Sequence, residues 1–187
     1  RSEKADQLWS SLCKGNREAL DQLFRFFYKP LLNYGLKIKS DREIVKDSIQ
    51  ELFLMLWKKH ASISQANSVD VYLLLSLRRI LLRKVKKQTA QSIRDRQHLE
   101  DDFTISFSIE EIIIDEELKK EKQCQMLKAL NSLNGRQKES LFLRYYHGLS
   151  NQEIADVMGI NHQSVRNNLS RALQSLRAVI QSAPLYE

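Results

Sequence analysis

Hydrophobic residues recur at helical spacing through the first part of the chain. Between Leu20 and Leu31 they fall at intervals of three and four residues, the period of a helix with one buried stripe. Gly15 and the asparagine after it predict a break before this segment, and Pro30 is expected to bend or restart it. The pattern therefore predicts two helical pieces within residues 5–39.

Two more helices are predicted after these. Residues 42–59 carry a helical stripe and are capped by the aspartate that precedes them. Residues 60–68, HASISQANS, read as a polar loop. The next helix is expected to begin at Ser68 or Asp70 and to continue to about Lys87.

The pattern changes after this helix. Residues 88–108 lose the periodicity and gain polar side chains, which is typical of a linker. A long helix is then predicted at about 109–132, followed by three more at about 135–147, 150–158 and 162–180.

The predicted fold class is all-α, with two small helical domains joined by a linker. The domains are expected at 1–87, a bundle of about four helices, and at 109–187, a four-helix domain, with 88–108 as the acidic linker. With only 5 Gly and 2 Pro, a turn-rich all-β protein is excluded.

The stretch LSNQEIADVMGINHQSVRNNLSRAL has the layout of a helix-turn-helix. Ser150 and Glu153 form a capping box at the start of the first helix. Gly159 can supply the left-handed turn that ends this helix, and Asn161 or Ser164 can start the second one. The small residues at the crossing let the two helices approach closely.

The outward face of the second helix favours nucleic acid over an ordinary helical hairpin in a core. Its side chains can hydrogen-bond to base edges or phosphates. They are His162, Gln163, Arg166, Asn167, Ser170 and Arg171.

Charge is distributed unevenly along the chain. The net charge is +7, and residues 1–87 carry 18 Lys+Arg against 9 Asp+Glu. Residues 88–115 carry 2 against 7, and residues 116–187 carry 10 against 7. Two basic blocks therefore flank an acidic middle, which is compatible with a polyanionic partner.

Several classes of protein are excluded by the residues that could carry chemistry. Neither a disulfide framework nor a zinc site is indicated, which suits a reducing cytoplasm, and no membrane span or signal peptide is predicted. No metal or triad constellation and no phosphate-cradling glycine loop is visible, so we expect no enzyme, no metal and no cofactor. The two cysteines and four histidines, which show no ligand-like spacing, are Cys13, Cys124, His60, His98, His147 and His162.

Two segments carry a resemblance to a known family. Within DREIVKDSIQELFLMLWKK, the motif D-x-x-Q-E-x-F is followed by a tryptophan and then by a basic helix. This resembles the core-binding region of bacterial sigma factors of the sigma-70 family, extracytoplasmic-function (ECF) type. The stretch LNSLNGRQKESLFLRYYHGLSNQEIADVMGINHQSVRNNLSRALQSLR resembles the fourth region of the same family. The resemblance covers nearly the whole chain, with both regions in the family's order.

The resemblance implies core RNA polymerase as a partner. Asp47, Gln50 and Glu51 match the positions that dock on a coiled coil in the largest catalytic-cleft subunit. A carboxylate–amide face suits a basic, arginine-bearing coiled coil. Taken alone, the three side chains would read as a solvated helix face.

The resemblance also implies that residues 60–87 open the −10 promoter element and hold its non-template strand. Tyr72 matches a position that is usually aromatic, with a core role as the alternative. A basic helix can otherwise lie on a membrane surface or simply face solvent. Arg79 and Arg83 depart from the family, in which many members carry Asn and Asp there. The expected phosphate contacts are Arg78, Arg79, Arg83, Lys84, Lys86 and Lys87.

For the −35 element, the resemblance assigns promoter DNA to the second helix of the helix-turn-helix. The matching positions are Arg166, Asn167, Ser170 and Arg171, with Asn168 and Gln163 as further candidates. The acidic linker, in relatives, threads the polymerase cleft, where it could imitate nucleic acid; an ordinary acidic linker is the alternative.

The remaining implied properties concern regulation. An anti-sigma factor, in many relatives membrane-anchored, is an expected partner, and no small-molecule substrate is expected. The expected location is the cytoplasm, at the nucleoid or sequestered at the inner membrane. The alternative function is a conventional helix-turn-helix regulator that binds duplex DNA without polymerase; it leaves D-x-x-Q-E-x-F and the basic helix unexplained.

Overall fold

The computed structural model describes residues 3–63, 66, 68–91 and 120–182 of the chain. These residues form eight α-helices and one short 3-10 helix, and no strand occurs among them. Their contacts divide the chain into two compact units, Arg1–Leu99 and Glu100–Glu187. The expected all-α fold class is confirmed.

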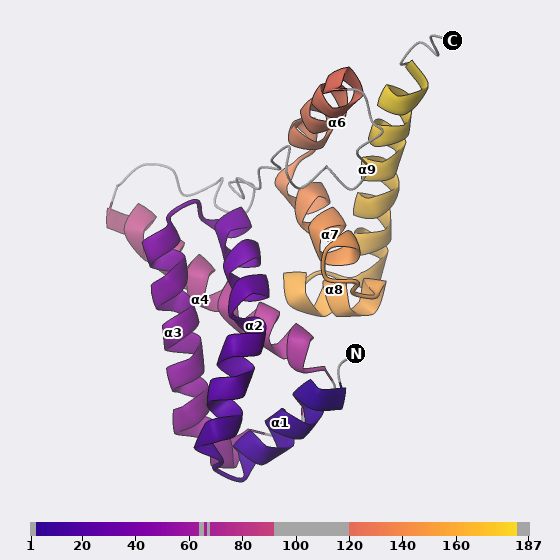
Figure 1. The fold of residues 1–187 in the computed structure, drawn as a ribbon. Helices are drawn as coiled ribbons and strands as arrows, with labels where there is room; N and C mark the ends of the chain where they lie inside the picture. Colours follow the sequence, from indigo (N-terminus) through magenta and orange to yellow (C-terminus); the bar gives the residue numbers. More distant parts are fainter. Residues whose placement is uncertain (1–2, 64–65, 67, 92–119, 183–187) are drawn as a thin grey trace. The chain divides into compact units, whose positions relative to one another are not determined.

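The first unit is a bundle of α1 (Glu3–Cys13), α2 (Arg17–Ile38), α3 (Arg42–Lys59) and α4 (Val69–Gln91), with η1 (His60–Ser62) after α3. Helices α2, α3 and α4 pack against one another in pairs, and α1 packs on α2 (Figure 1). Their inward faces form one hydrophobic core. Its most deeply buried side chains include Trp9, Leu12, Leu23, Leu31, Tyr34, Ile49, Leu52, Leu56, Leu73, Leu77 and Leu81.

The predicted breaks and caps of the first unit mostly hold. Gly15 adopts a φ of 85° in the turn after α1, and Asp41 caps α3 by accepting hydrogen bonds from the N–H groups of Glu43 and Ile44 at 3.0 and 3.1 Å. The expectation that Pro30 restarts the helix is wrong. Helix α2 runs through Pro30, because buried side chains before and after it hold both halves against the core.

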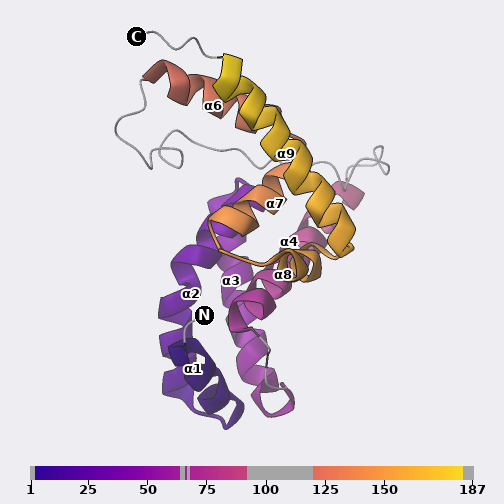
Figure 2. The ribbon, with the colours of Figure 1, turned by 90° about the vertical axis from the view of Figure 1, so that its right-hand side faces the viewer.

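The second unit consists of α6 (Lys120–Ser132), α7 (Gly135–Tyr145), α8 (Asn151–Met158) and α9 (His162–Ser182). Helix α9 packs against each of the other three, as its course in Figure 2 shows. The core at these contacts is mainly aliphatic. It includes Leu133, Leu141, Leu143, Ile154, Ala155, Val157, Val165 and Ala172.

The helix ends next to the expected linker differ from the sequence-based ones. Helix α4 continues to Gln91, beyond the expected end at Lys87. Residues 92–108 of the expected linker, and residues 109–119 of the expected long helix, lie outside the described residues. Among the described residues, no helix is both long enough and apolar enough to span a bilayer.

Among the glycines of the first unit, Gly35 of α2 leaves the least room for a side chain. A Cβ placed there would lie 2.4 Å from Cγ1 of Val45 on α3 and 3.5 Å from Cδ1 of Leu81 on α4. Val45 is fully buried and β-branched, so it cannot move aside easily.

We therefore expect Gly35→Ala to destabilise the protein by about 1–3 kcal/mol, although alanine usually favours a helix. Urea unfolding followed by circular dichroism would measure this loss. Gln22→Ala, at an exposed position of the same helix, is the control and should leave the stability within about 0.5 kcal/mol. A Gly35→Ala protein as stable as this control would contradict the account of the packing.

Candidate nucleic-acid and partner interfaces

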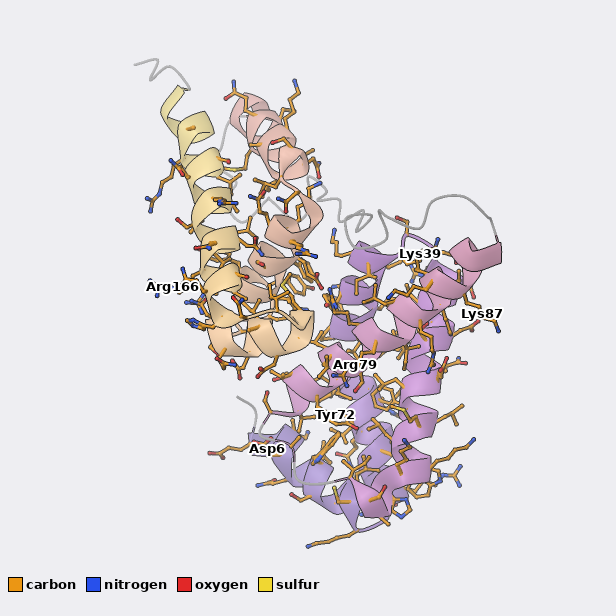
Figure 3. All side chains as sticks on the ribbon, turned by 180° about the vertical axis from the view of Figure 1, so that it is seen from behind. Asp6, Lys39, Tyr72, Arg79, Lys87 and Arg166 are labelled. Carbon is orange, nitrogen blue, oxygen red and sulfur yellow. The ribbon has the colours of Figure 1, made fainter. Side chains whose placement is uncertain are left out.

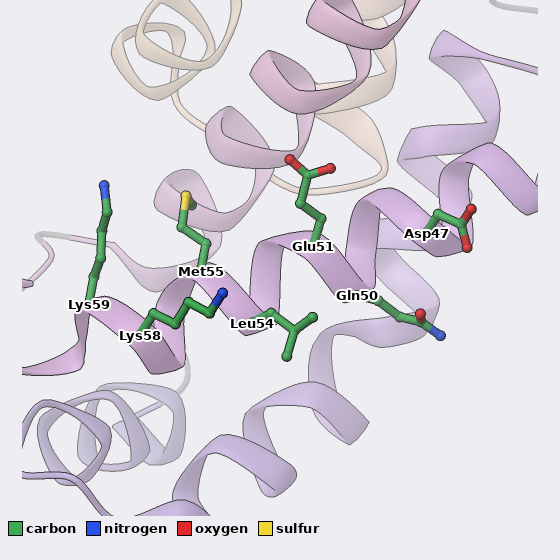
Figure 4. Close-up of a pocket in the computed structure, with 7 residues that line it drawn as sticks. All are labelled: Asp47, Gln50, Glu51, Leu54, Met55, Lys58 and Lys59. Carbon is green, nitrogen blue, oxygen red and sulfur yellow. The ribbon is translucent and has the colours of Figure 1, made fainter.

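One exposed stripe of α3 holds the three predicted partner-binding residues. Asp47, Gln50 and Glu51 are spaced at i, i+3 and i+4, so they share one side of the helix. They line a surface pocket, drawn in Figure 4, and the pocket continues along the same helix. Its other lining residues are Leu54, Met55, Lys58 and Lys59.

The chemistry of this stripe changes along α3. Carboxylates and an amide stand in its first half, Leu54 and Met55 in the middle, and two lysines at the end. Leu54 is 61% exposed, so the middle of the stripe presents an apolar side chain to solvent. Sequence reasoning missed the continuation beyond Glu51, although the same i+3, i+4 spacing extends through it. The stripe can therefore contact a helical partner over several turns.

The basic residues of α4 form a second surface. We call Arg78, Arg79, Arg83, Lys84, Lys86 and Lys87 the α4 strip. Arg79, Arg83, Lys86 and Lys87 are exposed, and Arg78 and Lys84 are half-buried. Figure 3 shows the positions of Arg79 and Lys87 along the helix. The strip can attract phosphate groups over several turns of α4.

Tyr72 packs against the core of the first unit, so its ring is not a fully exposed surface on which a base could stack. Its ring meets the buried Trp9 edge-on, with 5.0 Å between the ring centroids. The side chain is half-buried, so one side is committed to the bundle. This contact supports the core role that the sequence left open.

Glu51 connects the two surfaces. Its carboxylate oxygens accept from the guanidinium of Arg83 and from Nζ of Lys84, the latter at 3.2 Å. These ion pairs cannot be predicted from the sequence pattern, because Glu51 and Arg83 are 32 positions apart and the paired residues belong to different helices. The predicted polymerase-binding face and the predicted strand-binding strip therefore meet at one carboxylate.

The helix-turn-helix forms with the predicted caps. Ser150 accepts from the N–H of Glu153 at 3.3 Å, and the Glu153 carboxylate accepts from the Ser150 N–H at 2.9 Å. Gly159 ends α8 with φ 67° and ψ 35°, the left-handed conformation. Of the two predicted starts of α9, Asn161 is the cap: its side chain accepts from the Ser164 N–H at 2.7 Å.

Helix α9 places the predicted recognition residues outward. Val165, Leu169 and Ala172 are buried on its inner face. Asn168 is half-buried, and Gln163 donates to the side-chain oxygen of Asn167 at 3.0 Å. Figure 3 shows Arg166 projecting from the helix. The exposed set is Gln163, Arg166, Asn167, Ser170 and Arg171.

The turn before α8 combines a left-handed glycine with a side-chain hydrogen bond. Gly148 has a φ of 65°, and Arg144 donates to the carbonyl oxygen of Leu149 at 2.9 Å. His147 packs edge-on against Phe142 and Tyr146, with ring centroids 5.5 and 5.2 Å apart. Burial lowers the pKa of His147 to about 4, so the ring is neutral at neutral pH.

No group of three or more His, Cys, Asp or Glu side chains that could hold a metal ion occurs in the described part of the chain. Cys13 and Cys124 are free thiols.

Comparisons with known proteins bear on both units. The family model "Sigma-70, region 4" matches residues 125–176, which include the helix-turn-helix. The chain is 21% identical to the ECF RNA polymerase sigma factor SigK of Mycobacterium ulcerans, over 95% of this chain and 94% of that protein. It is 22% identical to the RNA polymerase sigma factor SigZ of Bacillus subtilis, over 87% of each.

Solved structures agree on the fold. CnrH, in complex with the cytosolic domain of CnrY, matches 97% of this chain and 100% of that chain, with a TM-score of 0.62 and 17% identity. The sigma factor RpoE of Bartonella quintana, in complex with the anti-sigma factor NepR, matches 88% of this chain and 98% of that chain, with a TM-score of 0.58 and 18% identity. The resemblance to ECF sigma factors is confirmed.

The lowered pKa of His147 predicts a pH dependence of stability. The unfolded chain binds a proton at this residue below about pH 6.5, whereas the folded chain does so only near pH 4. Stability should therefore fall as the pH decreases from about 6.5 to 4, because the unfolded state gains the proton first.

The free energy of unfolding should drop across this range by roughly 1–3 kcal/mol more in the wild-type protein than in His147→Gln. Urea unfolding at a series of pH values would measure the difference. His162→Gln, at an exposed histidine, should keep the wild-type dependence. Equal pH dependence of His147→Gln and the wild type would refute the assignment.

Proposed function

We propose that this chain, similar to ECF sigma factors along nearly its whole length, is a sigma factor that binds core RNA polymerase and directs promoter-specific initiation of transcription. One observation carries the proposal: the similarity spans both units in the family's order, and residues 125–176, matched to region 4, hold a complete helix-turn-helix. The chain supplies binding specificity, and RNA synthesis is the chemistry of the polymerase.

The α3 stripe is the proposed contact with core polymerase. Asp47 and Glu51 can accept hydrogen bonds from the arginines of a coiled coil, where charge-assisted pairs are the stronger ones, and the Gln50 amide can both accept and donate. The exposed Leu54 gives the same surface an apolar point of contact. The pocket on this face is open along α3, as a site for a partner helix needs to be.

The α4 strip is the proposed site for the −10 strand, together with the loop that precedes α4. Its lysines and arginines would neutralise phosphates, so binding should weaken as salt rises. Tyr72 can contribute only the part of its half-buried ring that remains exposed beside Trp9. Arg79 stands where many members of the resembled family carry an Asn that commonly helps select the −10 bases, so the family's −10 sequence is not carried over to this chain; the added arginines remain compatible with strand binding.

Helix α9 is the proposed reader of the −35 element in the major groove. Arg166 can bind the O6 and N7 atoms of guanine, and Asn167 can bind N6 and N7 of adenine, each pair discriminating by roughly 1–3 kcal/mol. The other exposed candidates add base or phosphate contacts. Helix α8, capped by Ser150, crosses the DNA backbone in this arrangement.

The proposed binding to the promoter is bivalent. It uses two domains, 1–87 and 109–187, which the linker 88–108 joins. Each domain binds one promoter element, and the linker raises the effective concentration of the second contact once the first has formed. Each contact can then be weak by itself.

An anti-sigma factor is a proposed further partner. Two proteins of similar fold were solved in complexes, CnrH with the cytosolic domain of CnrY and RpoE with the anti-sigma factor NepR. We expect the chain to act in the cytoplasm at the nucleoid and to be withheld from polymerase when such a factor binds it, at the inner membrane where that factor is anchored. No small-molecule substrate is part of the proposal.

The conventional regulator is the less favoured function. Similarity to sigma factors reaches across the first unit as well as the helix-turn-helix, and a regulator would leave the α3 stripe without a partner.

The polymerase contact can be tested by substitution. Replacing Asp47, Gln50 and Glu51 together with alanine should weaken binding to core RNA polymerase by at least about tenfold, because charge-assisted contacts would be lost. Fluorescence anisotropy of the labelled protein, titrated with cognate core polymerase, would measure the dissociation constant.

Helix α2 offers a matched control. Glu18, Asp21 and Gln22 are exposed and have the same i, i+3, i+4 spacing and the same residue types. Their replacement with alanine should leave the affinity for core polymerase within about twofold. Equal losses in the two triple variants would show that the α3 stripe is not the docking face.

A further inference from the structure

Glu51 is engaged by α4 through both oxygens of its carboxylate. The guanidinium of Arg83 donates to Oε1, and the ammonium of Lys84 lies 3.2 Å from Oε2. In Figure 4, the Glu51 side chain extends in a different direction from the side chains of Gln50 and Leu54, although all three line the same pocket. The predicted docking residue is therefore already occupied in the free chain.

This contact changes the charge of the α4 strip. Two of its six cations, Arg83 and Lys84, share the negative charge of Glu51, so part of their positive charge is neutralised before a phosphate binds. A carboxylate beside a phosphate-binding surface also repels the phosphates themselves. The free chain should bind nucleic acid less tightly than the composition of α4 suggests.

We propose that Glu51 is a shared carboxylate that masks Arg83 and Lys84 in the free chain and releases them to nucleic acid when a cationic partner binds α3. The inference rests on the proposed function, in which that partner is core RNA polymerase and the nucleic acid is the −10 strand. It adds a coupling between the two sites that runs through one side chain.

The ion pairs are exposed enough for a cationic partner to replace Arg83 and Lys84 at the Glu51 carboxylate. Glu51 is 39% exposed, and the side chains of Arg83 and Lys84 are 67% and 30% exposed. Ion pairs this accessible are weak, so an arginine of a partner can replace them without disturbing the core. The coupling is reciprocal: a strand that binds Arg83 and Lys84 also frees Glu51 for the partner.

The direct test is binding of a short fluorescein-labelled DNA single strand to the full chain without polymerase, at several salt concentrations. Glu51→Gln keeps the shape of the side chain and removes its charge. It should bind the strand about two- to fivefold more tightly at low salt. The slope of log affinity against log salt concentration should become steeper, by the amount that corresponds to about one or two additional phosphate contacts.

A matched control separates unmasking from the gain of one positive charge. Glu43→Gln makes the same change on the same helix, but the ion partner of Glu43 is Lys46 of α3, at 2.7 Å. Its affinity for the strand should stay within about 1.5-fold of wild type at moderate salt. If Glu51→Gln and Glu43→Gln behave alike, the masking proposal is overturned.

A double-mutant cycle locates the effect. In a protein that already carries Arg83→Gln and Lys84→Gln, adding Glu51→Gln should change the affinity no more than Glu43→Gln does. A full effect of Glu51→Gln in that background would also overturn the proposal, because no masked cation would remain.

A third variant tests the underlying function separately. Replacing Arg79, Lys86 and Lys87 with glutamine removes cations that are exposed in the free chain, and strand binding should fall at least fivefold. If it does not fall, or if wild type binds no strand at low salt, α4 is not a nucleic-acid site and both proposals fail. If it falls while Glu51→Gln matches Glu43→Gln, only the masking is wrong.

Discussion

Burial of one side of α3 determines which of its residues face outward. Val45, Ile49, Leu52 and Leu56 are each no more than 1% exposed, and burying such a side chain contributes about 1.5–3 kcal/mol. Rotating the helix would expose all four at once. The close approach of Gly35 to Val45 constrains α3 further. The packed side of α3 therefore keeps the proposed docking residues Asp47 and Gln50 facing outward, and Arg83 and Lys84 hold Glu51 in addition.

The same constraint operates in the second unit. Val165, Leu169 and Ala172 bind α9 to the core, so Arg166 and Asn167 face outward together. The caps of α8 and the left-handed Gly159 set where each helix begins and ends. The proposed interfaces on α3 and α9 are thus the outward faces of helices whose inward faces are core, and their orientation depends on packing that does not contact a partner.

This relation explains what the sequence could predict. A helix end depends on local chemistry, so Asp41, Ser150 and Gly159 were identified from neighbouring residues alone. Pro30 was misjudged because the packing around α2 overrides a local preference. The ion pairs of Glu51 could not be predicted, since they depend on how α3 packs against α4. The contact of Tyr72 with Trp9 could not be predicted for the same reason, because it depends on how α4 packs against α1.

The central claim is that the chain directs polymerase to promoters, and mapping transcript 5′ ends tests it most directly. Core polymerase, the purified chain and sheared genomic DNA should give discrete start sites that share upstream −10 and −35 motifs. Arg166→Ala with Asn167→Ala should abolish these starts or relax the −35 motif, whereas Gln174→Ala with Arg177→Ala, at exposed positions later in α9, should preserve them. Tight binding of duplex DNA without polymerase, and no start site that depends on the chain, would contradict the claim.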